Sequence, residues 1–206
     1  MSYFPMFIQL EGESCLVVGG GRIAFHKVKV LKDFGAEVVV VAPEISEDIK
    51  NMDGVTCQER RFDTRDLKGR RLAVAATDDR EENHRISLLC RKERIPVNAV
   101  DQTEDCDFIF PSYIKKGEVA AAFSSGGQSP VVTQYLKEQM QPILTEQLGE
   151  LTEQLGSLRS RVKQIEPAGV RKDVYQALLR QGLEQGGLLS EEDIGKIIAE
   201  KGLRRR

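Results

Sequence analysis

The sequence predicts an α/β fold in which a doubly wound parallel sheet comes first and helices dominate the C-terminal part. A short apolar run at residues 15–18 leads into a glycine-rich turn and then into a helical stretch. Strand-like and helix-like segments alternate over residues 5–110, as they do in parallel sheets joined by crossover helices. After Pro111 the alternation stops, and a hairpin signal and a series of helical segments follow.

The turn after the first strand has the G-x-G-x-x-A spacing of dinucleotide-binding folds. It consists of Gly19, Gly20, Gly21, Arg22, Ile23 and Ala24. We expect Gly19 to allow the tight turn, Gly21 to let the backbone approach a pyrophosphate, and Ala24 to let the helix lie against the sheet. The N–H groups at the start of that helix would meet the phosphates. The turn therefore predicts a Rossmann-type NAD-binding domain, which we place at residues 1–112.

The other strands of this sheet are predicted from their apolar runs and the turn residues around them. They cover residues 38–42, 55–60, 72–76 and 96–100. Residues 38–41 are all valine, as expected for a strand buried on both faces, whereas residues 55–60 are polar enough for an edge strand. In the helix after the glycine turn, Ala24, Val28 and Leu31 share the face that would cover the sheet.

The segment after the sheet predicts a small α+β region at residues 113–145. Residues 113–116 and 118–123 flank a Lys-Gly turn, which is a hairpin signal. Ser129, followed by Pro130, is the expected N-cap of a helix. A hairpin and one helix expose more apolar surface than an isolated arm tolerates, so we interpret this segment as a dimerisation region.

Apolar residues at heptad spacing come next. They are Leu144, Leu148, Leu151, Leu155, Leu158, Val162 and Ile165. Such a seam packs on a partner helix, either within a C-terminal bundle or in a second copy of the chain, and both alternatives stay open. With the shorter helical segments that follow, it predicts a helical C-terminal domain at residues 146–206. We expect a homodimer whose interface lies within residues 113–165.

Composition and charge narrow the class of protein. The 206 residues are 40% hydrophobic and 30% charged, and 30 basic against 32 acidic side chains give a net charge of −2. This balance argues against a nucleic-acid-binding protein, and no apolar run is long enough to cross a membrane. The four cysteines are widely spaced and the N-terminus has no basic segment, so we expect a cytoplasmic protein without disulfides.

The two histidines are too few for a histidine-rich metal site, and we expect no fixed metal. His26 follows the glycine turn on its helix, where it can touch an anion. For His84 we expect an ordinary helix residue.

Candidate cofactor contacts follow the ends of two predicted strands. Pro43 and Glu44 come after the second strand, where a carboxylate often holds the ribose hydroxyls of NAD. No arginine follows this strand to receive a 2′-phosphate, which favours NAD over NADP. Thr77 ends the strand at residues 72–76 and is a further candidate contact.

Two other segments carry candidate chemistry. Asp101 lies just past the carboxyl end of a predicted strand, where a carboxylate can accept a proton or hold a cation. The alternative is an aspartate that caps its own turn. The serine- and glycine-rich loop at residues 124–130 can bind an anion, or it can simply precede a capped helix.

A series of short motifs occurs in one order along residues 3–140: V-V-G-G-G-R-I-A-x-x-K, V-V-A-P, A-A-T-D, N-A-V-D, C-D-F-I-F-P-S and S-S-G-G-Q-S-P. This order strongly resembles the precorrin-2 dehydrogenase/sirohydrochlorin ferrochelatase family, which includes the standalone siroheme synthases and the N-terminal half of the fused enzyme. The resemblance implies oxidation of precorrin-2 to sirohydrochlorin with NAD. In bifunctional members, insertion of ferrous iron as a second substrate follows.

The resemblance also implies roles for individual residues. The family aspartate of both steps matches Asp101, which makes it the catalytic candidate and a transient contact for iron. Ser124 matches a serine that is phosphorylated in some members. Ser124, Lys115 and His26 are candidate substrate contacts, although relatives often have arginine at the position of His26. Because N-A-V-D is retained, the resemblance favours a bifunctional enzyme.

Three alternatives remain beside this interpretation. The chain can be a dehydrogenase that leaves chelation to a separate enzyme, or an NAD oxidoreductase for another small substrate. It can also be a non-catalytic, NAD-responsive module that dimerises through its C-terminal part. A methyltransferase-like interpretation of the glycine turn is weaker, because the second strand does not end in an acid.

Overall fold

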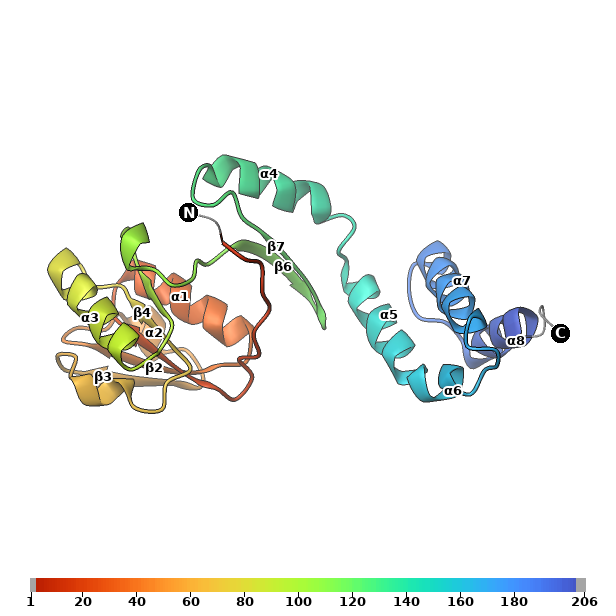
Figure 1. Cartoon of the computed structure of the whole chain (residues 1–206), viewed down its shortest axis with the longest axis horizontal. Coiled ribbons are helices and arrows are strands. Elements are labelled where there is room, and N and C mark those ends of the chain that lie inside the picture. The colour runs from red at the N-terminus through yellow and green to blue at the C-terminus, as the bar shows by residue number, and fades with distance from the viewer. Residues whose placement is uncertain (1–2, 203–206) are drawn as a thin grey trace. The chain divides into compact units, whose positions relative to one another are not determined.

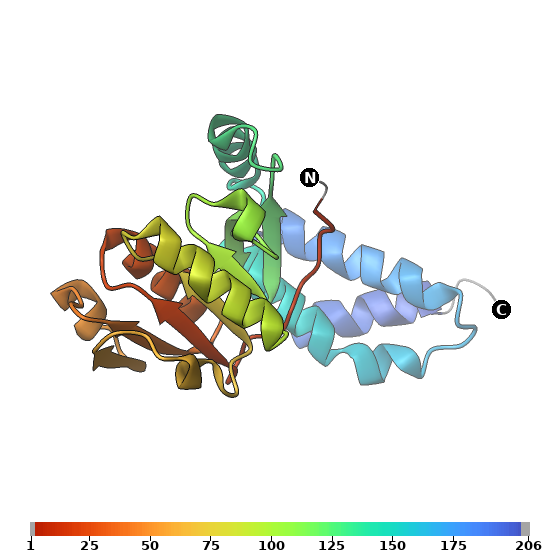
Figure 2. The ribbon, with the colours of Figure 1, turned by 60° about the vertical axis from the view of Figure 1, so that its left-hand side comes forward.

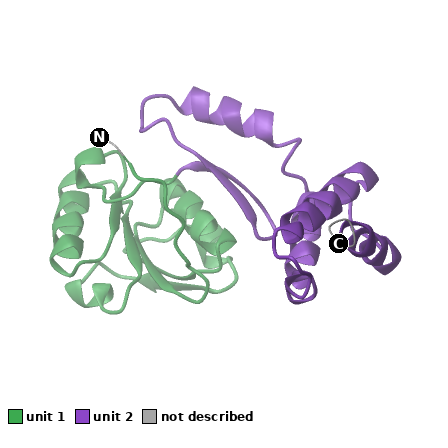
Figure 3. Ribbon diagram, turned by 45° about the vertical axis from the view of Figure 1, so that its right-hand side comes forward, with its two compact units in different colours: residues 1–110 green, residues 111–206 purple. Residues whose placement is uncertain are grey.

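The computed structural model describes residues 3–202 and divides the chain into two compact units, Met1–Phe110 and Pro111–Arg206 (Figure 3). The predicted domain boundary at residue 112 is close to the division between the units. The regions predicted at 113–145 and 146–206 fall within the second unit, and their separation stays a prediction.

The first unit is the predicted Rossmann-type domain (Figure 1). Its parallel strands are β1 (Ser14–Val18), β2 (Glu37–Ala42), β3 (Val55–Glu59), β4 (Leu72–Ala75) and β5 (Val97–Ala99). They form a five-stranded sheet in the order β3-β2-β1-β4-β5, with the polar β3 at one edge as predicted. The strand order reverses between β1 and β4, and ligands of such sheets bind outside the carboxyl ends at that point.

Helices cover both faces of this sheet because successive strand residues point to opposite sides. The connecting elements are α1 (Arg22–Asp33), α2 (Glu47–Lys50), α3 (Arg80–Lys92) and the 3₁₀ turns η1 (Thr64–Leu67) and η2 (Thr103–Asp105). Val28 of α1 packs in one core with Val17 of β1, whereas Ile86 of α3 packs in the other core with Leu16. The apolar face of α1 therefore covers the sheet, as the sequence predicts.

The second unit begins with the predicted hairpin and ends in a helical bundle. It comprises β6 (Ser112–Lys116), β7 (Val119–Phe123), α4 (Pro130–Met140), α5 (Glu146–Ser157), α6 (Arg159–Lys163), α7 (Val170–Gln185) and α8 (Glu191–Gly202). Helix α7 lies beside both α5 and α8 (Figure 2), and Leu151 of α5, Leu178 of α7 and Ile194 of α8 are buried together. Gly182 permits this packing, since a β carbon there would lie 2.6 Å from both δ carbons of Leu151.

The heptad spacing predicts one continuous helix, whereas the structure divides this segment between two helices. α5 ends at Ser157, and a separate short helix begins at Arg159. Leu151, Leu158 and Val162 are buried in the core of their own unit, which resolves the open alternative for these seam residues in favour of the bundle. None of the helices within residues 3–202 is both long and apolar enough to span a membrane.

Candidate active site

The glycine turn after β1 is shaped by the backbone that crosses beside it. Gly19 has a left-handed φ of +126°, and a β carbon there would lie 2.1 Å from the carbonyl oxygen of Ala76. A β carbon at Gly20 would lie 2.0 Å from the carbonyl oxygen of Glu44. Around Gly21, by contrast, no described atom lies within 4 Å of the missing β carbon. The first two glycines therefore serve close packing, and the third leaves open space.

The start of α1 offers hydrogen-bond donors to that open space. Phe25 makes the first helical bond, from its N–H to the Gly21 carbonyl, so the N–H groups of Arg22, Ile23 and Ala24 have no acceptor within the helix. Gly21 is the N-cap and supplies no side chain, and the first turn carries no acidic residue. This arrangement suits an anion such as a pyrophosphate.

The ends of β2 and β4 flank the glycine turn. Pro43 and Glu44 are exposed just after β2. Asn83 of α3, which the sequence did not indicate as a site residue, is buried and holds Thr77 through several hydrogen bonds. Thr77 lies just after β4. Its N–H and its hydroxyl both donate to Asn83 Oδ1, at 3.0 and 2.7 Å, and the Asn83 amide donates to the Thr77 carbonyl at 3.0 Å.

Asp101 follows β5 at the same edge of the sheet. It is exposed and has a left-handed φ of +59°. Within residues 3–202 no group donates a hydrogen bond to its carboxylate, so the alternative of an aspartate that caps its own turn is not observed. The carboxylate is therefore available to a ligand.

Lys27 of α1 is the cation associated with Asp101. Its Nζ lies 4.2 Å from the centroid of the Phe110 ring, over the ring face. Burial lowers the pKa of Lys27, and the nearby Cys106 and Asp101 oppose that shift. The relationship between Lys27 and Asp101, which are far apart in the sequence, comes from the fold.

The remaining predicted substrate contacts are dispersed. His26 is exposed on α1 beside Phe25, with ring centroids 5.7 Å apart. Ser124 and Lys115 are exposed and belong to the second unit, so their grouping with Asp101 stays a prediction. The Ser124 hydroxyl accepts a hydrogen bond from the Gly126 N–H at 3.1 Å, which holds the serine- and glycine-rich loop locally.

The predicted N-cap of the next helix is observed. The Ser129 hydroxyl accepts from the N–H of Val132 at 3.4 Å, at the start of α4.

Cys15 of β1 and Cys90 of α3 are buried in the two cores of the first unit. Burial raises the pKa of Cys15 to about 11 and that of Cys90 to about 12, so both remain thiols at neutral pH. In the described part of the chain, no three His, Cys, Asp or Glu side chains are grouped in a way that could hold a metal ion.

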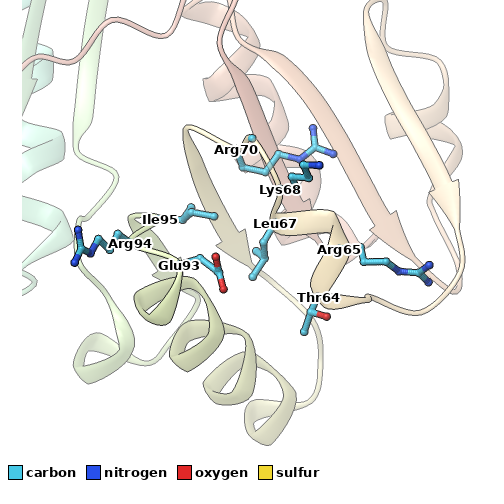
Figure 4. A pocket seen from close by; sticks show the side chains of 9 residues that line it. Thr64, Arg65, Leu67, Lys68, Arg70, Glu93, Arg94 and Ile95 are labelled. Atoms are coloured by element: carbon cyan, nitrogen blue, oxygen red, sulfur yellow. The ribbon is translucent and has the colours of Figure 1, made fainter.

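A depression of about 580 Å³ lies at the opposite edge of the sheet, beside the amino ends of β4 and β5 (Figure 4). Its lining includes the apolar Leu67 and Ile95 together with basic side chains. Figure 4 shows Arg65 and Arg94 extending to opposite sides of it, and Arg65 is already paired with Asp63 at 2.7 Å. None of the predicted site residues lines this depression.

Comparison with known proteins places the first unit in a family. A family model described as "Putative NAD(P)-binding" matches residues 6–112, more than half of the chain. The chain belongs to this family. The match covers the glycine turn, the ends of β2 and β4, and the loop that carries Asp101.

Similar proteins extend the match to most of the chain. The siroheme synthase of Thioalkalivibrio sulfidiphilus is 35% identical over 98% of this chain and 42% of its own length. That of Nitrosomonas europaea is 38% identical over 80% of this chain and 35% of its own length. The chain thus spans less than half the length of these curated relatives. The resemblance inferred from the motifs is confirmed.

A solved structure shares the fold. "SirC, precorrin-2 dehydrogenase" aligns with a TM-score of 0.67 and 22% sequence identity, covering 97% of this chain and 98% of that protein. At this level of identity the likeness establishes the α/β fold, as predicted.

Proposed function

We propose that the chain oxidises precorrin-2 to sirohydrochlorin with NAD as the oxidant. One observation carries the proposal: the exposed carboxylate of Asp101, which accepts no hydrogen bond from the residues that the structure describes, follows β5 at the sheet edge that also holds the glycine turn. The similarity to siroheme synthases and to a precorrin-2 dehydrogenase supports the choice of substrate.

The residues at the turn fit NAD. The open space at Gly21 and the donors at the start of α1 suit the pyrophosphate, and the Glu44 carboxylate after β2 suits the ribose hydroxyls. A carboxylate at that place also repels a 2′-phosphate, which favours NAD over NADP. We propose Arg22, Ile23 and Thr77 as further residues that would hold the cofactor. When bound, NAD supplies the acceptor for a hydride.

Asp101 is the proposed proton acceptor. Oxidation of precorrin-2 removes a hydride and a proton from the macrocycle, and the proton passes to the Asp101 carboxylate. The positive charge of Lys27 interacts with the charge of Asp101, and we propose that Lys27 also attracts the acidic side chains of the substrate. We assign the remaining substrate contacts to Ser124, Lys115 and His26.

A second activity is favoured by the same carboxylate. Asp101 makes no fixed contact that a passing ferrous ion or a pyrrole proton would have to displace. We therefore propose that the chain also inserts ferrous iron into sirohydrochlorin, with the iron as a substrate in transient contact with Asp101. Both reactions are proposed to take place in the cytoplasm.

An anaerobic assay of the whole chain tests the proposed function. Precorrin-2 is supplied with NAD, the reduced cofactor is followed, and ferrous or cobaltous ion is added after oxidation is complete. We expect stoichiometric oxidation and then metal insertion. Oxidation without insertion would leave a dehydrogenase that relies on a separate chelatase. NAD binding without any turnover would instead indicate a non-catalytic NAD-responsive module.

A further inference from the structure

The loop after β5, residues 100–111, carries Asp101 and is attached to α3 through the buried carboxylate of Asp105. Asp105 is only 3% exposed and lies in η2, a short distance along the chain from Asp101. Both of its carboxylate oxygens lie 2.9 Å from Nδ1 of His84 on α3. The Ser87 hydroxyl donates to the same carboxylate at 3.1 Å, and the Gln102 amide donates at 3.2 Å.

Arg91 adds a second fastening about two turns further along α3. Its guanidinium donates to the backbone carbonyl of Glu104 at 3.0 Å and to the carboxylate of Asp107 at 3.1 Å. A third nitrogen lies 3.9 Å from Asp105. The loop is thus held to one helix by side chains along its length.

The attachment depends on the negative charge of the Asp105 carboxylate. Burial acts to raise the pKa of the Asp105 carboxyl, but hydrogen bonds from His84 and Ser87 and the charges of His84 and Arg91 hold the pKa below its ordinary value. The group is therefore ionised at neutral pH. Leaving a buried carboxylate without one of its donors costs free energy. The loop must therefore keep this geometry or rearrange.

The side chain of Asp101 makes no hydrogen bond, within the described residues, that would explain its left-handed backbone conformation. A left-handed φ is unfavourable for most residues with a side chain, and aspartate adopts it where its side chain bonds locally or where the surroundings impose it. The Asp101 carboxylate accepts no hydrogen bond in the described part of the chain. On one side, the N–H of Val100 donates to Ala75 of β4 at 2.9 Å. On the other side, the N–H of Gln102 donates to the Ala99 carbonyl at 3.4 Å, which closes a turn around Asp101, and the attachment of Asp105 to α3 holds the chain that follows this turn.

We propose that the His84–Asp105 pair is a positioning device that holds Asp101 in its left-handed conformation at the carboxyl edge of the sheet. His84 acts through Asp105 and the intervening loop and is not assigned any contact with the reacting atoms. The catalytic consequence rests on the proposed function, whereas the attachment of the loop can be tested without any activity.

Four substitutions on α3 separate this role from a general effect on the helix. His84→Ala removes the donor, and His84→Asn keeps an N–H donor close to the place of Nδ1. Arg85→Ala is the matched control, because Arg85 is the next residue and its guanidinium pairs with Glu82 at 2.7 and 2.8 Å, away from the loop. Ser87→Ala removes a single donor and is the milder version should His84→Ala fail to fold.

Hydrogen exchange of the loop is the first measurement. The N–H of Asp105 donates to Gln102 at 3.0 Å, and the N–H of Asp107 donates to Val97 at 2.8 Å. We expect both amides to exchange about tenfold faster in His84→Ala, as the loss of a hydrogen bond to a charged group allows. The rates should stay near wild type in Arg85→Ala. Wild-type exchange in both His84→Ala and Ser87→Ala would overturn the proposal.

Kinetics with precorrin-2 and NAD are the second measurement. We expect kcat to fall about tenfold in His84→Ala and to recover within about threefold in His84→Asn, while the Kd for NAD changes less than about twofold. Faster hydrogen exchange in the loop of His84→Ala together with an unchanged kcat would overturn the positioning role. If the wild-type chain does not oxidise precorrin-2, the proposed function fails, and hydrogen exchange still decides whether the pair holds the loop.

Discussion

A β carbon at Gly20 would lie 2.0 Å from the carbonyl oxygen of Glu44, which ties the turn after β1 to the chain that leaves β2. The next bond supports the same contact, since the N–H of Ser46 donates to the Gly20 carbonyl at 2.9 Å. The phosphate-binding turn and the proposed ribose contact are therefore built as one structure. At Gly21, one residue later, the surroundings are open.

This difference predicts opposite effects of two alanine substitutions. Gly20→Ala meets a backbone oxygen that cannot move aside cheaply, so we expect a loss of about 1–3 kcal/mol in the free energy of unfolding and loss of NAD binding. Gly21→Ala meets nothing and should fold normally, yet its methyl group occupies the space left for the pyrophosphate. Thermal unfolding and NAD titration of both variants check this. Normal NAD affinity in Gly21→Ala would contradict the proposed cofactor position.

Cofactor choice is predicted to depend on Glu44. The wild-type chain should bind NAD more tightly than NADP, because an exposed carboxylate after β2 meets the ribose hydroxyls and repels a 2′-phosphate. Glu44→Ala should weaken NAD binding and reduce the discrimination. Fluorescence titration of both cofactors gives the ratio, with Glu47→Ala on α2 as a nearby control. Equal or tighter NADP binding by the wild-type chain is the contrary result.

Acid pH should weaken the first unit through Asp66. This buried aspartate receives two hydrogen bonds from Arg60, at 2.5 and 2.8 Å, and they hold its pKa below the ordinary value. A lowered carboxyl pKa stabilises the fold above about pH 4, and the stabilisation is lost as the pH falls through the lowered value.

Asp66→Asn should therefore cost about 1–2 kcal/mol at pH 7. The difference from wild type should shrink towards pH 3. Urea unfolding at both pH values measures it, and Asp53→Asn, a change at an exposed aspartate, is the control. A difference that stays constant with pH would show that the charge of Asp66 is not the cause.

The fold follows from local signals in the sequence to a large extent. The valines of β2 face both cores of the first unit, and the apolar face of α1 packs in one of them. Periodic patterns of this kind can be recognised from the sequence without knowing the tertiary structure.

The polar contacts around the candidate site could not be predicted in the same way. His84 has the sequence context of an ordinary helix residue, and its pairing with Asp105 requires α3 to lie beside the loop after β5. Thr77 and Asn83 are joined only because β4 and α3 meet at that turn. The heptad seam does not form one continuous helix: α5 ends at Ser157, α6 begins at Arg159, and Leu158 between them is buried in the bundle core.

The predicted homodimer now depends on α4 more than on the heptad seam. Val131 and Tyr135 of α4 are 77% and 58% exposed, whereas central seam residues are buried within the unit. We expect light scattering to give twice the chain mass of 23.1 kDa at micromolar concentration. Val131→Glu with Tyr135→Glu should yield monomers. Leu183→Glu, at a side chain 57% exposed on α7, should not. A wild-type monomer would rule the dimer out.

The most direct test of the central proposal is the rate of NAD-dependent precorrin-2 oxidation by Asp101→Ala. Glu104→Ala, on the same loop, is the matched control. A proton acceptor contributes about 10²–10⁴-fold to a rate, so we expect Asp101→Ala to lose at least about a hundredfold in kcat and to lose iron insertion, with NAD affinity unchanged. Glu104→Ala should retain wild-type rates. Oxidation and iron insertion at the wild-type rate by Asp101→Ala would contradict the assignment of Asp101 as the catalytic residue.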